Sequence, residues 1–289
     1  MATGTTTSFS HDASCPGISP TVCADPDIET VDHEHHQGVT MARAQVSLSY
    51  GMGKGWQAMA RLPVDMKYLT INYTTPDGQP YDPPYGNIHH RNETLLGLGD
   101  GQWELQKYAR LGESVTLGAG FGTTVPLGRT EENPYALAAQ GETHQHMQMG
   151  SGTIDPVGSL SAVWMSHRWG WMATTSGRMP LYDNSKGYRP SPTINFSVGP
   201  TYRVTSKTMV TSSMGVRRDW QATWDGEPDE LSGLTAIDGS AAVIYRFTPS
   251  LAMMGLGRVN FGQWSDEVLI KQGFVGTVGV TITPSGKAR

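Results

Sequence analysis

The chain has 289 residues, of which 37% are apolar and 35 are glycines, and its formal charge is -5. This charge and the absence of a basic stripe argue against a nucleic-acid partner. No stretch of the sequence reaches the roughly 20 apolar residues that a transmembrane helix needs. A mean hydropathy of -0.36 is unusual for a packed globule. It is typical of a transmembrane β-barrel, whose interior is polar and whose strands expose only half of their residues to lipid.

The first 38 residues lack a clear periodicity, so we expect them to form a plug, a strap or a first strand. They begin with a polar run, which indicates a mature chain without its signal peptide. The spacing of Cys15 and Cys23 matches neither a zinc knuckle nor a haem attachment site. We expect a disulfide between them, which implies an oxidising compartment. Two free buried thiols are the alternative.

From residue 39 to residue 283, polar and apolar residues alternate with the period of two that a β-strand requires. The first regular strand has an apolar face of Ala42, Ala44, Val46, Leu48 and Tyr50, opposite Arg43, Gln45, Ser47 and Ser49. In the next strand Trp56, Ala58, Ala60, Leu62 and Val64 oppose Gln57, Arg61 and Asp65. Further strands are expected around 102–110, 115–121, 171–178, 194–204, 209–217, 239–247, 251–261 and 268–282, and residues 284–289 form a tail.

Residues 143–166 continue the alternation, and we expect one strand with a flexible joint at the Gly-Ser-Gly step that starts at Gly150. His144 and His146 then share the polar face, because residues two apart on a strand point the same way. The same alternation predicts that Met147 and Met149 face lipid.

The connections between these strands alternate between long and short, as in outer-membrane barrels with long outer loops and short periplasmic turns. Aromatic residues beside the short turns are Tyr50, Trp56, Tyr108, Trp164, Trp169, Trp171, Tyr202, Tyr245 and Phe247. Those near the long loops are Tyr68, Tyr182, Trp220, Phe261 and Trp264. Two such girdles are the interfacial belts of a membrane barrel. We therefore predict an all-β fold, an antiparallel transmembrane β-barrel of about twelve strands in a bacterial outer membrane.

Three motifs carry a resemblance to a known family. They are the Gly-Leu-Gly-Asp sequence at 97–100, the Pro-Leu-Gly sequence at 126–128, and the Gly-Ser-Gly-Thr step at 150–153. Together they resemble an outer-membrane barrel family that is associated with meta-pathway phenol degradation and described as transporter-like. The resemblance is best over residues 40–165. It implies a channel or uptake role for small, often hydrophobic compounds, and it transfers no catalytic residue.

The predicted topology gathers seven of the nine histidines at the outer mouth: His33, His35, His36, His89, His90, His144 and His146. Imidazole suits zinc and copper(II), and nearby methionines would suit copper(I) if they turned inward. A metal site for copper or zinc is therefore one hypothesis, and histidines that are merely hydrated are the alternative.

Other constellations are weaker. Calcium is a less favoured cofactor, because the acidic run Asp25, Asp27, Glu29, Asp32 and Glu34 lacks the spacing of an EF-hand. Ser166 and His167 are neighbours at a tight turn and no Gly-x-Ser-x-Gly elbow is present, so we expect no enzyme. Charged side chains expected in the lumen, as salt bridges or as a ladder for anions, are Arg43, Arg61, Asp65, Arg178, Arg203, Arg217, Arg246 and Arg258.

The sequence thus predicts a porin-like channel or uptake protein for small molecules, including hydrophobic ones, surrounded by outer-membrane lipid. One alternative is a metal-binding barrel that uses the histidine cluster. A second alternative is a structural barrel that assembles with copies of itself into a surface array.

Overall fold

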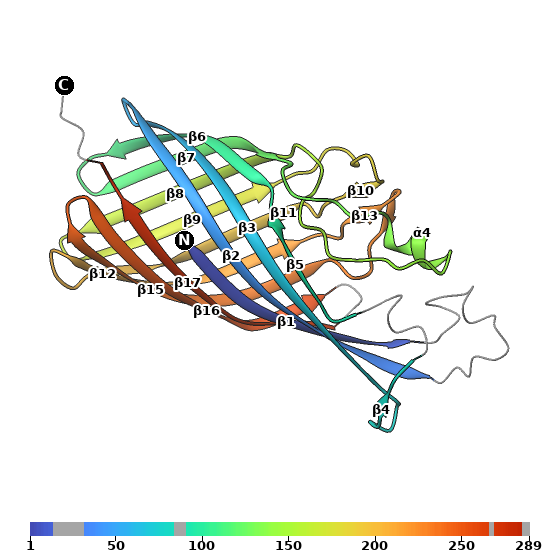
Figure 1. Cartoon of the computed structure of the whole chain (residues 1–289). Helices are drawn as coiled ribbons and strands as arrows, with labels where there is room; N and C mark the ends of the chain where they lie inside the picture. The colour runs from blue at the N-terminus through green and yellow to red at the C-terminus, as the bar shows by residue number, and fades with distance from the viewer. Residues whose placement is uncertain (14–31, 84–90, 266–268, 285–289) are drawn as a thin grey trace.

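The computed structural model describes residues 1–13, 32–83, 91–265 and 269–284, and these form a closed antiparallel barrel of twelve strands (Figure 1). The first half of the wall consists of β1 (Ala2–Ala13), β2 (His33–Gly53), β3 (Trp56–Thr74), β5 (Glu93–Leu98) with β6 (Gly101–Leu111), β7 (Val115–Val125) and β8 (Pro156–Ser166). The second half consists of β9 (Trp169–Arg178), β11 (Thr193–Arg203), β12 (Thr208–Asp219), β15 (Leu234–Thr248), β16 (Leu251–Ser265) and β17 (Leu269–Ile282). The expected fold class is confirmed.

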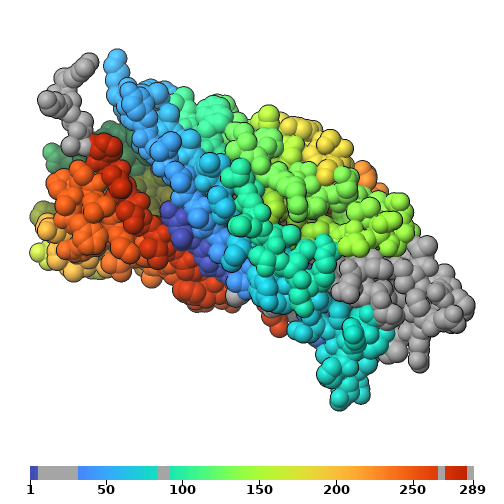
Figure 2. Space-filling model, viewed as in Figure 1, coloured from blue at the N-terminus to red at the C-terminus, as the bar shows by residue number. Residues whose placement is uncertain are grey.

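Several small elements lie in the long loops at one end of the barrel. They are β4 (Pro80–Tyr81), the helix α4 (Pro134–Ala138), and a sheet of β10 (Tyr188–Arg189), β13 (Thr223–Trp224) and β14 (Glu227–Pro228). In the space-filling view the green segment around residues 126–155 lies packed over this end (Figure 2). No helix among the described residues is long and apolar enough to cross a membrane.

The barrel is closed by β1, which pairs with β17 on one side and with β2 on the other. Ala2 lies opposite both Val278 and Ala44. Part of the N-terminal region is therefore a wall strand. Since β2 begins at His33, the wall also includes residues that we expected to precede it. Cys15 and Cys23 lie outside the described residues.

The two faces of the wall follow the alternation in the sequence. Apolar side chains on the outer face are strongly exposed, for example Leu48 at 69% and Phe121 at 67%. Glu104 and Gln106 lie on the inner face and are buried. Hydrocarbon would cover the outer face in a membrane, since every backbone group of a closed barrel is paired within the sheet.

The aromatic side chains form two bands at the strand ends, with one exception among those expected. Trp56, Trp169 and Trp171 are exposed near the short turns, and Trp220 and Trp264 are exposed near the long loops. Tyr108 instead lies on the inner face, where its hydroxyl donates to Gln106 Oε1 over 2.9 Å and it lines a cavity. The prediction that Tyr108 belongs to the aromatic girdle was wrong. Tyr108 and Gln106 are two residues apart on the same strand, so both side chains point to the inner face.

The prediction of a single strand over residues 143–166 was wrong in its first half. Only Pro156–Ser166 is a strand, and the preceding residues form a loop. The amides of Met149 and Gly150 both donate to the carbonyl of Arg129, which turns this loop back toward the barrel. Met149 is 7% exposed and packs with Val39, Leu69 and Leu95, and the partly buried Met41 and Met147 pack against this cluster. The two methionines therefore do not face lipid.

Candidate functional site: the polar lumen

A break in the wall lies between β5 and β6. Both segments pair with β3: Leu98 lies opposite Val64, and Gln102 lies opposite Arg61. Between them the amide of Gly99 donates to the carbonyl of Pro63 over 3.2 Å. A Cβ at residue 99 would lie 2.7 Å from Asp65 Oδ2, so a larger residue would have to displace the Asp65 carboxylate. Glycine avoids this displacement, and the break leaves the next residue, Asp100, outside the two strands.

Asp100 ties three distant segments together. Its carboxylate accepts hydrogen bonds from the amide of Ser151 at 2.7 Å, the hydroxyl of Ser151 at 2.6 Å and the amide of Gly128 at 3.2 Å. Gly128 and Gly150 touch through their backbones, since a Cβ on Gly128 would lie 2.6 Å from the Cα of Gly150. The three motifs at 97–100, 126–128 and 150–153 therefore meet at one point, which we call the Asp100 junction.

Further contacts hold the loop between β7 and β8 against the barrel. The ammonium group of Lys67 donates to the carbonyl of Gln148, and the Gln148 side chain accepts from the amide of Glu131 over 2.7 Å. Asn184, from the loop after β9, donates to the carbonyl of Ser151 over 2.9 Å. Because these bonds come from both sides of the lumen, the loop is fixed over the interior of the barrel.

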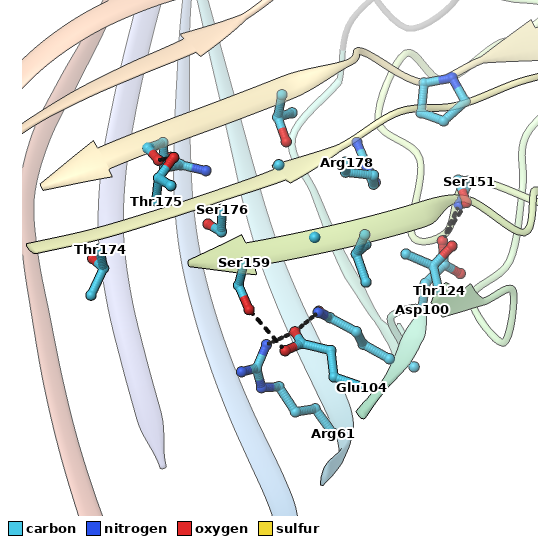
Figure 3. A pocket seen from close by; sticks show the side chains of 18 of the residues that line it. Arg61, Asp100, Glu104, Thr124, Ser151, Ser159, Thr174, Thr175, Ser176 and Arg178 are labelled. Carbon is cyan, nitrogen blue, oxygen red and sulfur yellow. Dashed lines mark hydrogen bonds and ion pairs between the residues drawn. The ribbon is translucent and has the colours of Figure 1, made fainter. Parts of the chain in front are cut away.

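Beneath this loop lies a polar cavity of about 600 Å³. Side chains of β6, β8 and β9 point into it, among them Glu104, Ser159 and Ser176 (Figure 3). A second cavity of about 340 Å³ is bounded by β1, β11, β12 and β15 to β17. Thr174, Ser176 and Asn195 line both cavities, so the two spaces adjoin each other inside the barrel.

Glu104 is the centre of the charged network in the larger cavity. Its carboxylate lies 3.4 Å from Arg61 Nη1, and it accepts hydrogen bonds from the side chains of Gln102, Gln106 and Ser159 (Figure 3). A buried carboxylate is costly unless it is paired and hydrogen-bonded. These contacts therefore fix the position of the Glu104 carboxyl group in the wall of the lumen.

Two more ion pairs line the same space. Arg43 binds Asp65 through two hydrogen bonds of 2.6 and 2.8 Å, a fork geometry that fixes both side chains. Arg178 Nε lies 3.9 Å from Asp155 Oδ2, in the loop just before β8. Burial raises the pKa of the Asp155 carboxyl, and the positive charge of Arg178 partly offsets this effect.

The arginines expected in the lumen separate into two groups. Arg43, Arg61 and Arg178 line the larger cavity, and Arg217 and Arg258 line the smaller one. The remaining two, Arg203 and Arg246, are exposed at the ends of β11 and β15 beside the short turns, and neither lines these cavities.

None of Glu104, Asp100 and Ser159 was predicted from the sequence as a site residue, although Asp100 belongs to the motif at 97–100. The alternation around Glu104 places it between Gln102 and Gln106 on a polar face, and that was the available signal. For Asp100 no local pattern reveals that its partners are 28 and 51 residues away.

The five described histidines of the expected cluster do not form one site. His33 and His35 are buried side by side on the inner face of β2, whereas His36 is on the opposite face and contacts Thr74 Oγ1 at 2.8 Å. His89 and His90 lie outside the described residues. Among the residues that the structure describes, no group of three or more His, Cys, Asp or Glu side chains could hold a metal ion.

His144 and His146 form a separate pair in the loop after α4. Their rings meet edge to face, with centroids 5.2 Å apart, and His144 Nδ1 lies 2.9 Å from the carbonyl of Glu142. Burial lowers the pKa of His144, and the neighbouring Arg91 lowers this pKa further, against the effect of the Glu142 carbonyl. The contact with the Glu142 carbonyl thus fixes the His144 ring, and the His146 ring packs against it.

No protein-family model and no curated protein matches the chain. Several solved structures, however, match the chain in fold. An outer-membrane channel from Pseudomonas putida F1 matches with a TM-score of 0.56 and 12% identity, over 98% of this chain and 95% of that one. The CymD monoaromatic hydrocarbon channel has a TM-score of 0.44 and 9% identity, over 98% and 87%. A FadL homologue of Pseudomonas aeruginosa has a TM-score of 0.43 and 10% identity, over 97% and 90%. The first of these similarities shows that the chain has the fold of an outer-membrane channel.

Proposed function

We propose that this protein is a channel of a bacterial outer membrane that lets small molecules pass. The observation that carries the proposal is a polar cavity of about 600 Å³, adjoined by a second cavity, inside a closed barrel whose outer face is apolar. A barrel that served only as a structural unit would fill its interior with packed side chains. The similarity in fold to the Pseudomonas putida channel supports the same function.

The orientation follows from the loops. Outer-membrane barrels place their short turns in the periplasm and their long loops outside. The Asp100 junction and the loop between β7 and β8 then lie at the outer mouth, where an entering solute first meets the protein.

The solute class that we propose is small compounds that combine an apolar body with a polar group, such as phenols. The resemblance to barrels associated with phenol degradation supports this class. So does the mouth itself, where the apolar cluster of Val39, Leu69, Leu95 and Met149 lies beside the lumen. Hydroxyl groups of Ser159, Thr174 and Ser176 provide hydrogen bonds deeper inside.

The test is ion conductance of the purified protein in planar lipid bilayers. We expect discrete steps of current, and we expect phenol added on the loop side to reduce the current while it occupies the lumen. Ser159→Trp places a large ring in the cavity and should lower the conductance several-fold. Leu160→Trp is the matched control, since the neighbouring residue faces outward and is exposed. A wild-type protein without conductance, or equal conductance in both variants, contradicts the proposal.

A further inference from the structure

Arg258 of β16 differs from the other arginines of the lumen in its partners. Arg43, Arg61 and Arg217 each lie within 3.4 Å of a carboxylate oxygen. Arg258 forms no ion pair within 4.0 Å and no side-chain hydrogen bond with any other residue that the structure describes. It lines the smaller cavity. A guanidinium group carries five N–H donors and stays charged, so this one is able to bind an anionic group that enters the cavity.

The register of the sheet explains why Asp238, a carboxylate that lines the same cavity, does not take up Arg258. Arg258 lies opposite Ser240 of β15, whereas Asp238 lies opposite Asn260, two residues further along. The Asp238 carboxylate leans toward β12, since a Cβ built on Gly215 would lie 3.1 Å from Asp238 Oδ1. β12 and β16 flank β15 on opposite sides. Asp238 is thus turned away from the strand that carries Arg258.

The residues around Arg258 combine hydroxyl groups with apolar side chains. Ser240 lies opposite Arg258 on one side, and Val275 of β17 lies opposite it on the other. Leu256 is two residues away on the same face, and Thr277 lies opposite Leu256. All four of these neighbours line the smaller cavity. A ligand held by the guanidinium group would therefore meet hydroxyl groups beside its charge and apolar surface beside the rest of its body.

These hydroxyl groups keep the capacity to donate to a ligand. Ser213 and Ser240 share one hydrogen bond of 2.8 Å, and Thr3 and Thr277 share another of 3.1 Å. Each hydroxyl has a hydrogen of its own, and one hydrogen makes each of these bonds. One O–H donor per pair is thus left for a group that enters the cavity.

We propose that Arg258 binds the carboxylate group of small amphiphilic solutes in the smaller cavity, with their apolar part against Leu256 and Val275. The inference rests on the proposed channel and names its solute class: monocarboxylates with an apolar body, such as aromatic acids. Guanidinium and carboxylate groups match in shape and join through two parallel hydrogen bonds. The cavity of about 340 Å³ has the size of small-molecule sites. The charge of Asp238 acts on Arg258 from a distance, so a second anionic group on the solute would be repelled.

Benzoate and benzamide are the probes, because they have similar shapes and differ in charge. Their binding to the full chain, purified in detergent, is measured by saturation-transfer NMR, which does not depend on conductance. We expect Arg258→Gln to weaken benzoate binding about ten-fold or more and to leave benzamide binding nearly unchanged. Arg246→Gln is the matched control, since Arg246 lines neither cavity, and it should bind benzoate as wild type does.

Asp238→Asn tests the same site in the opposite direction. It removes a negative charge that acts on Arg258, so we expect benzoate to bind more tightly than to wild type. Tighter binding supports a site for an anion. Loss of benzoate binding in this variant, with folding verified by heat-dependent migration on gels, would mean that the ligand needs both charges, and it would overturn the assignment to monocarboxylates.

The proposal is also overturned if folded Arg258→Gln binds benzoate as tightly as wild type, or if wild type binds benzoate no better than benzamide. Bilayer recordings keep this result separate from the channel itself. A wild-type protein that binds benzoate but carries no current supports the site and contradicts the channel. A wild-type protein that conducts but does not bind benzoate contradicts the site alone.

Discussion

At the scale of single residues, Asp100 holds the loop of the outer mouth through three hydrogen bonds to Ser151 and Gly128. Asp100→Ala removes both acceptor oxygens, and with them all three hydrogen bonds, and should cost about 1–3 kcal/mol of local stability. We expect the loop to leave its position more often, so that single-channel currents become larger and noisier. Asp77→Ala, at an exposed carboxylate in the loop after β3, is the control and should leave the currents unchanged. If the two variants gave identical single-channel currents, the Asp100 junction would have no part in controlling how open the mouth is.

His144 makes the same loop sensitive to pH. Its pKa is lowered by burial, and the charged group facing it is Arg91, whose Nη1 donates to the His144 carbonyl, while the His146 ring lies beside it. A folded pKa below the ordinary value of about 6.5 contributes stability above that pH, and this stability is lost as the pH falls through the folded pKa.

Currents should therefore become noisier on acidification below about pH 6.5, and His144→Gln should flatten this dependence. Bilayer recordings of both proteins between about pH 8 and pH 5 measure it. A His144→Gln protein that responds to acid as wild type does would assign the response to another group.

At the scale of elements, close contacts between strands depend on particular glycines. A Cβ on Gly122 of β7 would lie 1.9 Å from the carbonyl oxygen of Trp103 on β6, whereas a Cβ on Gly255 of β16 would meet nothing within 4 Å. Gly122→Ala should therefore separate β6 from β7, at a cost of about 1–3 kcal/mol or more. Gly255→Ala should be close to neutral. Urea titrations in lipid vesicles compare the two variants, and equal midpoints would contradict the argument.

Strands were also the elements that the sequence predicted well. The alternation assigned the inner and outer faces of β2, β3, β7 and β11, because a wall between lipid and a wet lumen imposes polarity on every second residue. The same reasoning failed at residues 143–155, where a period-two pattern occurs in a loop. Hydrogen bonds to Asp100 and Arg129 decide the path of that loop, and no local pattern reports such distant partners.

The candidate site was predictable to a similar extent. The alternation of side chains along β2 put His33 and His35 on one face and His36 on the other. It does not give the distance between these histidines and those on other segments. It therefore suggested one histidine cluster where the described residues hold two separate pairs. Arg43 and Arg61 were placed on the polar face, while their partners across the wall required the register of the sheet.

At the scale of the whole molecule, the cost of introducing a charged side chain depends on whether its position faces lipid or the lumen. Leu160 is central on the outer face of β8 and is 59% exposed. Leu160→Arg should destabilise the barrel in a bilayer by about 2–4 kcal/mol, because an arginine at mid-depth has to leave water. Thr174→Arg, on the next strand but inside the lumen, should cost much less. Folding free energies in lipid vesicles test the pair of variants, and equal costs would mean that lipid does not cover this face.

The seam between β1 and β17 has a consequence for assembly. Every other neighbouring pair of wall strands is joined by a stretch of chain, whereas these two join the beginning of the sequence to its end. The ring can therefore close only after all its hairpins have formed, and closure pairs residues as far apart as Ala2 and Val278. Until then the growing sheet keeps two free edges, which invite pairing with other chains. Closure is thus the step at which folding in the membrane competes with aggregation.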